Sequence, residues 1–390
     1  MSAVRDRPVI PAARHGDRLD RARAAMARHA VTGLLVGVGS DLRYLTGYVA
    51  MPLERLTMLV LPVRGPASLV APHLESMAAA GSPAAAAGLV EVVPWDETDD
   101  AHALAAGRLS DALGAAPAGR LLVSGDLWAM HVLALQGVLP GCAFGLATEV
   151  LRELRMPKDE DEITLLRLAA EAADRAMDQI VTGPLVGRTE LEVSAEIRDR
   201  LIAEGHETAE FAIVGSGPNS ASPHHRPTDR RIQAGEPIVF DIGGSLSGYA
   251  SDTTRTVWVA GPDLASPPSD EFRRIHGLVR EAQETATAAA LEGASCESVD
   301  GVARRIIAAG GHGPDFFHRV GHGIGLEGHE EPYLVAGNAE PLRPGVAFSV
   351  EPGVYLAGRY GVRIEDVVVC REDGPQVLNR SERALRVVTG

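Results

Sequence analysis

Two acidic residues interrupt the otherwise strand-like stretch VFDIGGSLSGYASDTTRTVWV, and their placement constrains how this part of the chain folds. Asp241 and Asp252 flank the turn-forming run GGSLSG, which predicts a β-hairpin. If the two acids face each other directly, the hairpin is centred between Leu246 and Ser247, and their Cβ atoms lie about 5 Å apart. Facing carboxylates repel each other, and burying them is costly, so the pattern indicates a cation between them.

A second stretch, SVEPGVYLAGRYGVRIEDVVV, repeats this pattern. Glu351 and Glu365 flank the glycine-bearing run LAGRYG, which predicts a hairpin centred on Gly358, with strand-like sequence before and after it. Two hairpins that each offer a pair of acids are suited to a site for two cations. Carboxylates can bridge two divalent metal ions that lie about 3.5–4 Å apart.

A histidine that suits such a site lies in HRVGHGIGLEGHEEP. His322 stands between glycines, which allow close approach of the backbone, and histidine is the commonest nitrogen ligand of metals in proteins. His329 follows seven residues later. Single histidines are usually packing or surface residues, but the glycine content here is too high for an ordinary strand or helix. We therefore predict a functional site at this segment.

The amino-acid composition argues against several classes of protein. The net charge of −15, from 37 basic and 52 acidic residues, argues against nucleic acid as a partner, because phosphate binding requires basic patches. Cys142, Cys296 and Cys370 form no CxxC pair, so we expect reduced thiols that pack in the protein. The N-terminus lacks a signal-peptide pattern, and we find no membrane span, so a cytoplasmic protein is expected.

The order of the predicted elements indicates two domains. Strands alternate with helices in residues 1–155, which predicts an α/β domain. Residues 156–390 separate helices from strands, which predicts an α+β domain with an antiparallel sheet. Pro157 and the charged run after it mark the entry to a long helix at this boundary. Further helices are expected at about 190–202, 270–291 and 295–309.

From Pro157 onward the chain resembles the pita-bread metallopeptidases, which include methionine aminopeptidase, aminopeptidase P and prolidase. The motifs DIGGSLSGYASDTTRT, HRVGHGIGLEGHEEP and EPGVYLAGRYGVRIED resemble the Xaa-Pro branch in particular. An N-terminal α/β domain is also typical of that branch and of creatinase. The ligand order of the family, Asp-Asp-His-Glu-Glu, is matched by Asp241, Asp252, His322, Glu351 and Glu365.

The resemblance implies a mechanism and the residues that carry it. Two divalent ions are expected, with Mn best suited to the carboxylate-rich ligand set and Co, Zn or Fe(II) as alternatives. Such ions would hold a water and lower its pKa, so that hydroxide is available to attack the peptide carbonyl. Glu351 both ligates and shuttles the proton, and His329 and His224, from the PH pair in SASPHHRP, donate hydrogen bonds to the reacting peptide. Arg363 lies on the same strand face as Glu365 and is expected to hold a carboxylate in place.

The implied activity is removal of the N-terminal residue from an Xaa-Pro peptide or dipeptide, by an enzyme expected to be a homodimer. Two positions depart from the family: Tyr333 stands where some prolidase-like members carry a basic residue, and Val346 replaces a common methionine. Three alternatives stay open. They are a metal-dependent hydrolase or lyase of a small non-peptide metabolite, a non-catalytic binding relative, and methionine aminopeptidase, which the N-terminal domain disfavours.

Overall fold

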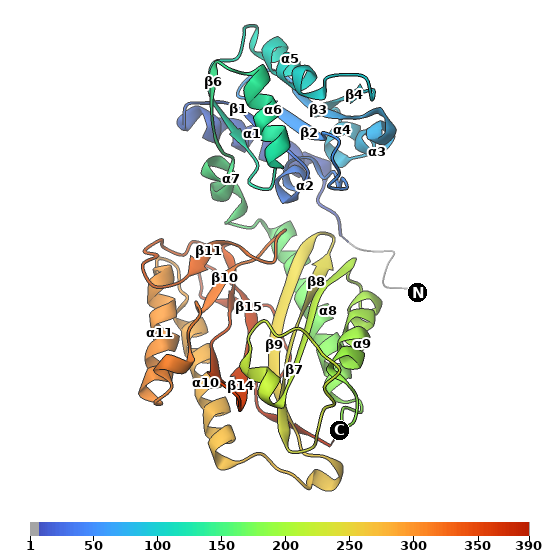
Figure 1. The fold of residues 1–390 in the computed structure, drawn as a ribbon. Helices are drawn as coiled ribbons and strands as arrows, with labels where there is room; N and C mark the ends of the chain where they lie inside the picture. Colours follow the sequence, from blue (N-terminus) through green and yellow to red (C-terminus); the bar gives the residue numbers. More distant parts are fainter. Residues whose placement is uncertain (1–7, 390) are drawn as a thin grey trace. The chain divides into compact units, whose positions relative to one another are not determined.

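The structure, a computed structural model, describes residues 8–389 (Figure 1). Residues 1–7, where the sequence shows no signal-peptide pattern, lie outside the described part. The chain forms two compact units, one of residues Val9–Arg155 and one that begins at Met156.

The first unit is built around a mixed six-stranded sheet with the strand order β4-β3-β2-β1-β5-β6. β1 pairs antiparallel with β2 and parallel with β5, and helices lie on the faces of the sheet (Figure 1). The strands are β1 (Val31–Val36), β2 (Met58–Pro62), β3 (Ala67–Pro72), β4 (Val90–Trp95), β5 (Gly119–Val123) and β6 (Cys142–Leu146). The helices are α1 (Ala12–Arg28), α2 (Ser40–Thr46), α3 (Ser76–Ala80), α4 (Pro83–Ala86), α5 (Ala101–Leu113), α6 (Ala129–Val138) and α7 (Thr148–Arg155).

The second unit contains a four-stranded sheet, β17-β9-β8-β7, a five-stranded sheet, β11-β10-β12-β15-β16, and the separate pair β13-β14. Its pairings are antiparallel except for β17, which runs parallel to β9. The strands are β7 (Thr208–Ser216), β8 (Glu236–Leu246), β9 (Tyr249–Val259), β10 (Gly321–Gly323), β11 (Glu330–Leu334), β12 (Ala347–Val350), β13 (Gly353–Leu356), β14 (Tyr360–Arg363), β15 (Asp366–Val369), β16 (Gln376–Val377) and β17 (Arg386–Val388). The helices are α8 (Glu160–Val181), α9 (Glu190–Ala203), α10 (Asp270–Ala289) and α11 (Cys296–Ala309).

The helices of the second unit begin where side chains cap their free N–H groups. Asp159 and Thr189 each form a capping box, with Glu162 and Glu192 respectively, at the starts of α8 and α9. α8 and α9 cover the sheet of β7, β8 and β9, whereas α10 and α11 lie together beside the other strands (Figure 1). Two buried apolar clusters, one under each helix pair, hold the helices to the strands.

The β8–β9 hairpin has a different register from the one expected. Asp241 pairs with Thr254 and Asp252 pairs with Gly243, so the two acids are diagonal neighbours on one face and not directly opposed. The cause is the turn, which Ser247 and Gly248 form with φ values of 49° and 86°. Two residues with positive φ characterise the type I′ turn that the strand twist favours, so the hairpin centre moves by one residue.

The β13–β14 hairpin has the predicted register, and its centre is Gly358. Gly353 pairs with Arg363 and Leu356 pairs with Tyr360, and Gly358 has a φ of 73°. The same register continues outward, since β12 pairs antiparallel with β15. Glu351 and Glu365 therefore stand side by side between two pairs of strands, where both can point into one space.

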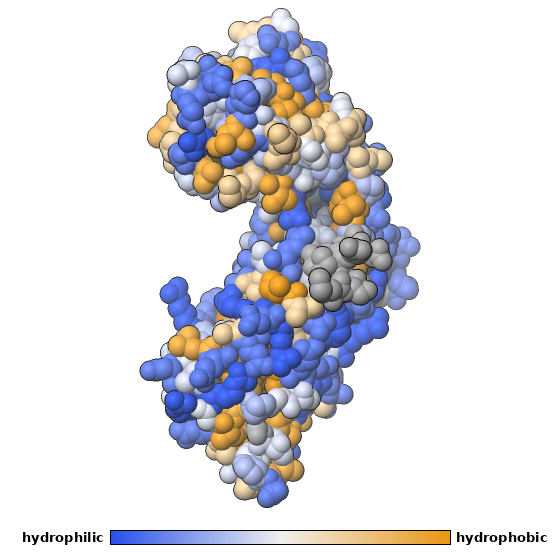
Figure 2. Space-filling view, turned by 90° about the vertical axis from the view of Figure 1, so that its right-hand side faces the viewer, coloured by the Kyte–Doolittle hydropathy of each residue, from blue (hydrophilic) through white to orange (hydrophobic). Residues whose placement is uncertain are grey.

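In the part of the chain that the structure describes, no helix combines the length and the apolarity needed to cross a membrane. Figure 2 shows that hydrophilic side chains cover most of the drawn face of the second unit, with hydrophobic residues in separate small groups. The three cysteines are free thiols, and Cys296 and Cys370 are buried in the protein, as predicted, while Cys142 is partly exposed.

Candidate metal centre

One cavity of about 730 Å³ in the second unit collects the site residues that the sequence singles out. They come from two hairpins, from the glycine-rich segment around β10, and from the loop before β8. Phe211, Ile213 and Phe317 add apolar walls. The predicted residues that line this cavity are His224, Asp241, Asp252, His322, His329, Glu351, Arg363 and Glu365.

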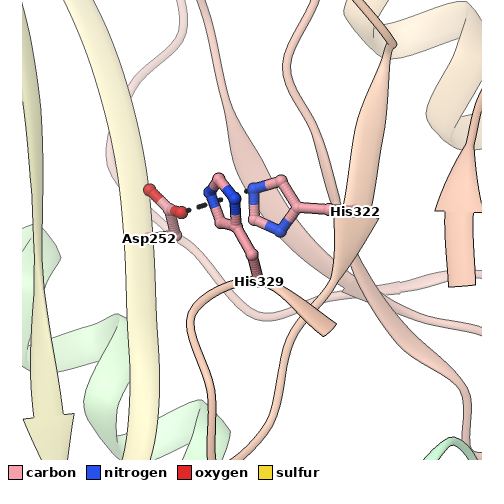
Figure 3. Close-up of side chains that lie close together, drawn as sticks. All are labelled: Asp252, His322 and His329. Carbon is pink, nitrogen blue, oxygen red and sulfur yellow. Dashed lines mark ion pairs between the residues drawn. The ribbon is translucent and has the colours of Figure 1, made fainter. Parts of the chain in front are cut away.

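Metal-binding atoms of these residues form three overlapping groups. In each group, the carboxylate oxygens and imidazole nitrogens lie within 4.8 Å of one another. Asp252, His322 and Glu365 each belong to two groups, so the three groups form one continuous cluster. The groups are Asp241–Asp252–Glu365, His322–Glu351–Glu365 and Asp252–His322–His329, the last of which is drawn in Figure 3.

His322 is oriented so that one ring nitrogen faces the acids. Its Nδ1 lies 3.1 Å from the carbonyl oxygen of Gly323, to which it donates a hydrogen bond. Its Nε2 lies 3.2 Å from Oε1 of Glu351. It also lies 3.6 Å from Oδ2 of Asp252, and Figure 3 marks this ion pair with a dashed line. A backbone acceptor at one nitrogen fixes the tautomer and leaves the lone pair of the other nitrogen available to a metal.

The acids are held by strand partners that leave some oxygens free. Thr254, directly across from Asp241 in the sheet, donates a hydrogen bond of 2.6 Å to Oε2 of Glu365. Within residues 8–389, the buried Oδ1 of Asp241 has no hydrogen-bond partner. A buried carboxylate oxygen without a donor is unfavourable in a protein, and it fits a position that a cation occupies.

The electrostatics of the cluster also point to missing positive charge. Burial, followed by repulsion from the neighbouring carboxylates, raises the pKa of both Asp252 and Glu365 well above the ordinary range. Four carboxylates face one another, and the buried cation among them is Arg363. Divalent cations remove this repulsion, and oxygen donors with one imidazole form a ligand set that such ions accept. The residues present therefore fit the metal ions that the sequence leads us to expect.

Arg363 holds Asp241 in place. Its guanidinium forms an ion pair with Oδ2 of Asp241, and its Nε donates a hydrogen bond of 3.1 Å to Oγ1 of Thr254. Nη1 donates to the hydroxyl of Tyr355 at 3.1 Å, and that hydroxyl also lies 3.0 Å from Nε2 of His318. The sequence predicts Arg363 beside a carboxylate, whereas it does not predict a role for Tyr355 or His318.

His329 and His224 stand on the exposed side of the cluster. The ring of His329 lies 3.7 Å from the ring of His322, centroid to centroid. Partial burial, and then the proximity of His322, lowers the pKa of His329 to about 4, so its ring is neutral at pH 7. Both histidines line the cavity and can offer N–H groups to a ligand there.

A buried carboxylate that the sequence did not reveal anchors the loop of His224. Glu190, at the start of α9, accepts hydrogen bonds of 2.7–3.2 Å from Ser216, Asn219, His225 and Thr228. His225, for which the sequence suggested no role, therefore has a structural one. Glu190 also occupies the first helical position after a threonine N-cap, where an acid is ordinary, so its sequence context carried no signal of this function.

The fold and the cluster define a class of protein. Residues 164–372 match the metallopeptidase family M24, and residues 18–157 match the creatinase/prolidase N-terminal domain. The chain therefore belongs to the metallopeptidase family M24, in its Xaa-Pro peptidase branch, as the sequence motifs indicated.

Individual relatives cover nearly the whole chain. A probable dipeptidase, PepE, of Mycobacterium tuberculosis is 44% identical over 375 residues, which is 95% of this chain and 96% of the relative. An Xaa-Pro dipeptidase of Lactobacillus helveticus is 39% identical over 67% of this chain and 71% of its own. The crystal structure of dipeptidase PepE from Mycobacterium ulcerans superposes with a TM-score of 0.89 and is 42% identical, with 98% of this chain and 100% of that chain covered.

Proposed function

We propose that the chain is an Xaa-Pro dipeptidase that uses two divalent metal ions. The observation that carries the proposal is the single cluster of four carboxylates and two imidazoles, those of His322 and His329, in which an oxygen of Asp241 has no partner among the described residues. Four carboxylates and two divalent ions have a formal charge of zero. The proposed ligands are Asp241, Asp252, His322, Glu351 and Glu365.

Manganese is the proposed metal, because four of the five ligands are hard carboxylates and one is an imidazole. When bound, the two ions supply a water of lowered pKa and polarise the carbonyl group that it attacks. Glu351, whose Oε1 accepts a hydrogen bond of 3.2 Å from Ser349, takes the proton of the water and passes it to the leaving proline nitrogen. His224 and His329 donate hydrogen bonds to the peptide oxygen as its negative charge develops.

Specificity for proline is supported by the relatives and by the cavity. An Xaa-Pro amide has no N–H, so peptidases that bind substrates as a β-strand lack a donor they need. The cavity here offers an apolar wall of Phe211, Ile213 and Phe317, against which a proline ring can pack. Of the relatives, one is named a probable dipeptidase, one a dipeptidase and one an Xaa-Pro dipeptidase, so we propose the dipeptide as the substrate. The homodimer and the cytoplasmic location stay predictions.

The experiment is an assay of chelator-treated protein after addition of Mn, Co or Zn. We expect Mn-dependent release of alanine from Ala-Pro, slower cleavage of Ala-Pro-Ala, and no cleavage of Ala-Ala. Elemental analysis of the active protein should find two Mn ions per chain. Equal cleavage of all three peptides, or activity that survives complete metal removal, contradicts the proposal.

A further inference from the structure

The cavity is lined by two arginines, and they differ in how their charge is balanced. Arg363 is buried and paired with Asp241. Arg319 is partly exposed, and among residues 8–389 no carboxylate lies within ion-pair distance of its guanidinium. Its contacts are the ring of Tyr333, 4.2 Å from its Cζ, and Nδ1 of His329, 3.4 Å from Nη2. Arg319 is therefore a cation of this cavity whose charge is not neutralised.

Arg319 is also held in a defined place. Arg319 lies just before β10, and its guanidinium stacks on the ring of Tyr333 in β11. Tyr333 pairs with His322 of β10 in the sheet. The carbonyl oxygen of Arg319 accepts a hydrogen bond of 2.7 Å from Nδ1 of His318. Stacking fixes the plane of a guanidinium and leaves its N–H edge free to donate. This geometry prepares Arg319 to bind a planar anion in the cavity.

The position of Arg319 suits the terminal carboxylate of an Xaa-Pro dipeptide. His329 contacts Arg319 on one side and the ring of His322 on the other, so the guanidinium lies one imidazole away from the proposed metal ligands. In an Xaa-Pro dipeptide, the terminal carboxyl carbon lies about 3–4 Å from the carbonyl carbon that is attacked. A dipeptide whose carbonyl group is at the metal centre can therefore extend its carboxylate past His329 toward Arg319. In a longer peptide the same carbon belongs to a neutral amide.

We propose that Arg319 is an anion subsite that binds the free carboxylate of the proline residue and so selects peptides that end at proline. The inference rests on the proposed function, and it adds a specificity-determining residue to it. Guanidinium and carboxylate form charge-assisted, two-pronged hydrogen bonds, which supply geometry as well as attraction. The subsite accepts other small carboxylates of similar shape, and free proline is expected to bind as the product.

The test compares Ala-Pro with Ala-Pro-amide, which differ in the terminal group alone. For the Arg319→Gln variant, we expect the ratio of kcat/KM for the acid to kcat/KM for the amide to fall about 10- to 100-fold, as the loss of a charged hydrogen bond implies. Arg319→Lys should restore part of the ratio. Arg343→Gln, at an exposed arginine outside the cavity lining, is the matched control and should leave the ratio as in the wild type.

A binding measurement separates this inference from the proposed function. Calorimetric titration of the Mn-loaded protein with L-proline and L-prolinamide reports on the subsite without turnover. We expect the wild type to bind proline more tightly than prolinamide, and we expect Arg319→Gln to lose that preference. If Arg319→Gln lowers kcat/KM and affinity equally for the acid and the amide, or changes neither quantity, the subsite is overturned even if Xaa-Pro cleavage is confirmed. A wild type that cleaves neither peptide but keeps the Arg319-dependent proline preference contradicts the dipeptidase activity alone.

Discussion

At the scale of single residues, the charge balance of the cluster determines how each substitution acts. Asp252 is buried among three other carboxylates, and its pKa is raised by burial and then by repulsion from Glu365 and Asp241. Without metal this carboxylate destabilises the fold, and with metal the same carboxylate becomes a ligand. Replacing Asp252 by a neutral residue should therefore stabilise the metal-free protein and harm the metal-loaded protein.

The first prediction tests these opposite effects of Asp252 in the absence and presence of metal. Asp252→Asn removes a buried repulsion, so the melting temperature of chelator-treated protein should rise by a few degrees. In Mn-containing buffer the variant should lose metal and fall more than about 100-fold in kcat/KM, since even residues that only support ligands contribute 10- to 100-fold. Differential scanning fluorimetry with and without chelator, together with the Ala-Pro assay, checks both. Full activity in the variant would overturn the assignment of Asp252 as a ligand.

The second prediction concerns Arg363. Its guanidinium contacts Asp241, Thr254 and Tyr355 at once, and a lysine ammonium cannot reproduce this planar geometry. Arg363→Lys should therefore lower kcat on Ala-Pro by about 10- to 100-fold and weaken Mn binding, although the charge is kept. Steady-state kinetics and a Mn titration measure the two effects. Wild-type values for both in the lysine variant would show that charge alone matters at this position.

At the scale of elements, the turns decide which side chains meet. The β13–β14 hairpin follows directly from its sequence, because Gly358 marks its centre. The β8–β9 hairpin was predicted one residue away from its true centre, because GGSLSG offers several turn positions and the pattern of apolar residues does not choose between them. The preference for a type I′ turn, with glycine second, would have selected Ser247 and Gly248.

The third prediction tests this turn. Gly248 has a φ of 86°, which an alanine adopts only with strain, so Gly248→Ala should lower the free energy of unfolding by about 1–2 kcal/mol. Gly277 is the matched control, since it lies inside helix α10 and a Cβ there meets no atom within 4 Å. Gly277→Ala should raise the free energy of unfolding by about 0.5–1 kcal/mol. Urea unfolding measures the two free energies. A change of the same sign in both variants would contradict this account of the turn.

The fourth prediction concerns the element that carries His224. Burial alone raises the pKa of Glu190, but hydrogen bonds from Ser216, His225 and Asn219 outweigh it and lower the pKa to about 2. A lowered carboxyl pKa stabilises the fold above the pKa of the unfolded chain, near 4.3, and this stability is lost as the pH falls toward 2.

Glu190→Gln should therefore be less stable than the wild type by on the order of 3 kcal/mol at pH 7. The difference should stay constant down to about pH 5 and then narrow, because the wild type loses its advantage on protonation. Urea unfolding of both proteins at pH 7, 5 and 4 measures this. A difference that is constant over the whole range would mean that the charge of Glu190 contributes nothing.

At the scale of the whole molecule, the sequence predicted the family, the two kinds of architecture and the residues that gather at the cavity. It succeeded there because the acids and His322 lie in long motifs whose order along the chain reflects one shared site. It did not reveal Thr254, Tyr355 or Glu190, because each acts through a contact with a distant segment. Arg319 was likewise hidden, since its lack of a carboxylate partner is visible only in three dimensions.

The most direct test of the central claim, that the cluster holds a pair of cations, is anomalous X-ray diffraction from Mn-soaked crystals. We expect two peaks about 3.5–4 Å apart. One should lie among Asp241, Asp252 and Glu365, and the other among His322, Glu351 and Glu365. A cavity with no peak, or with ions bound only at other positions, would contradict the account.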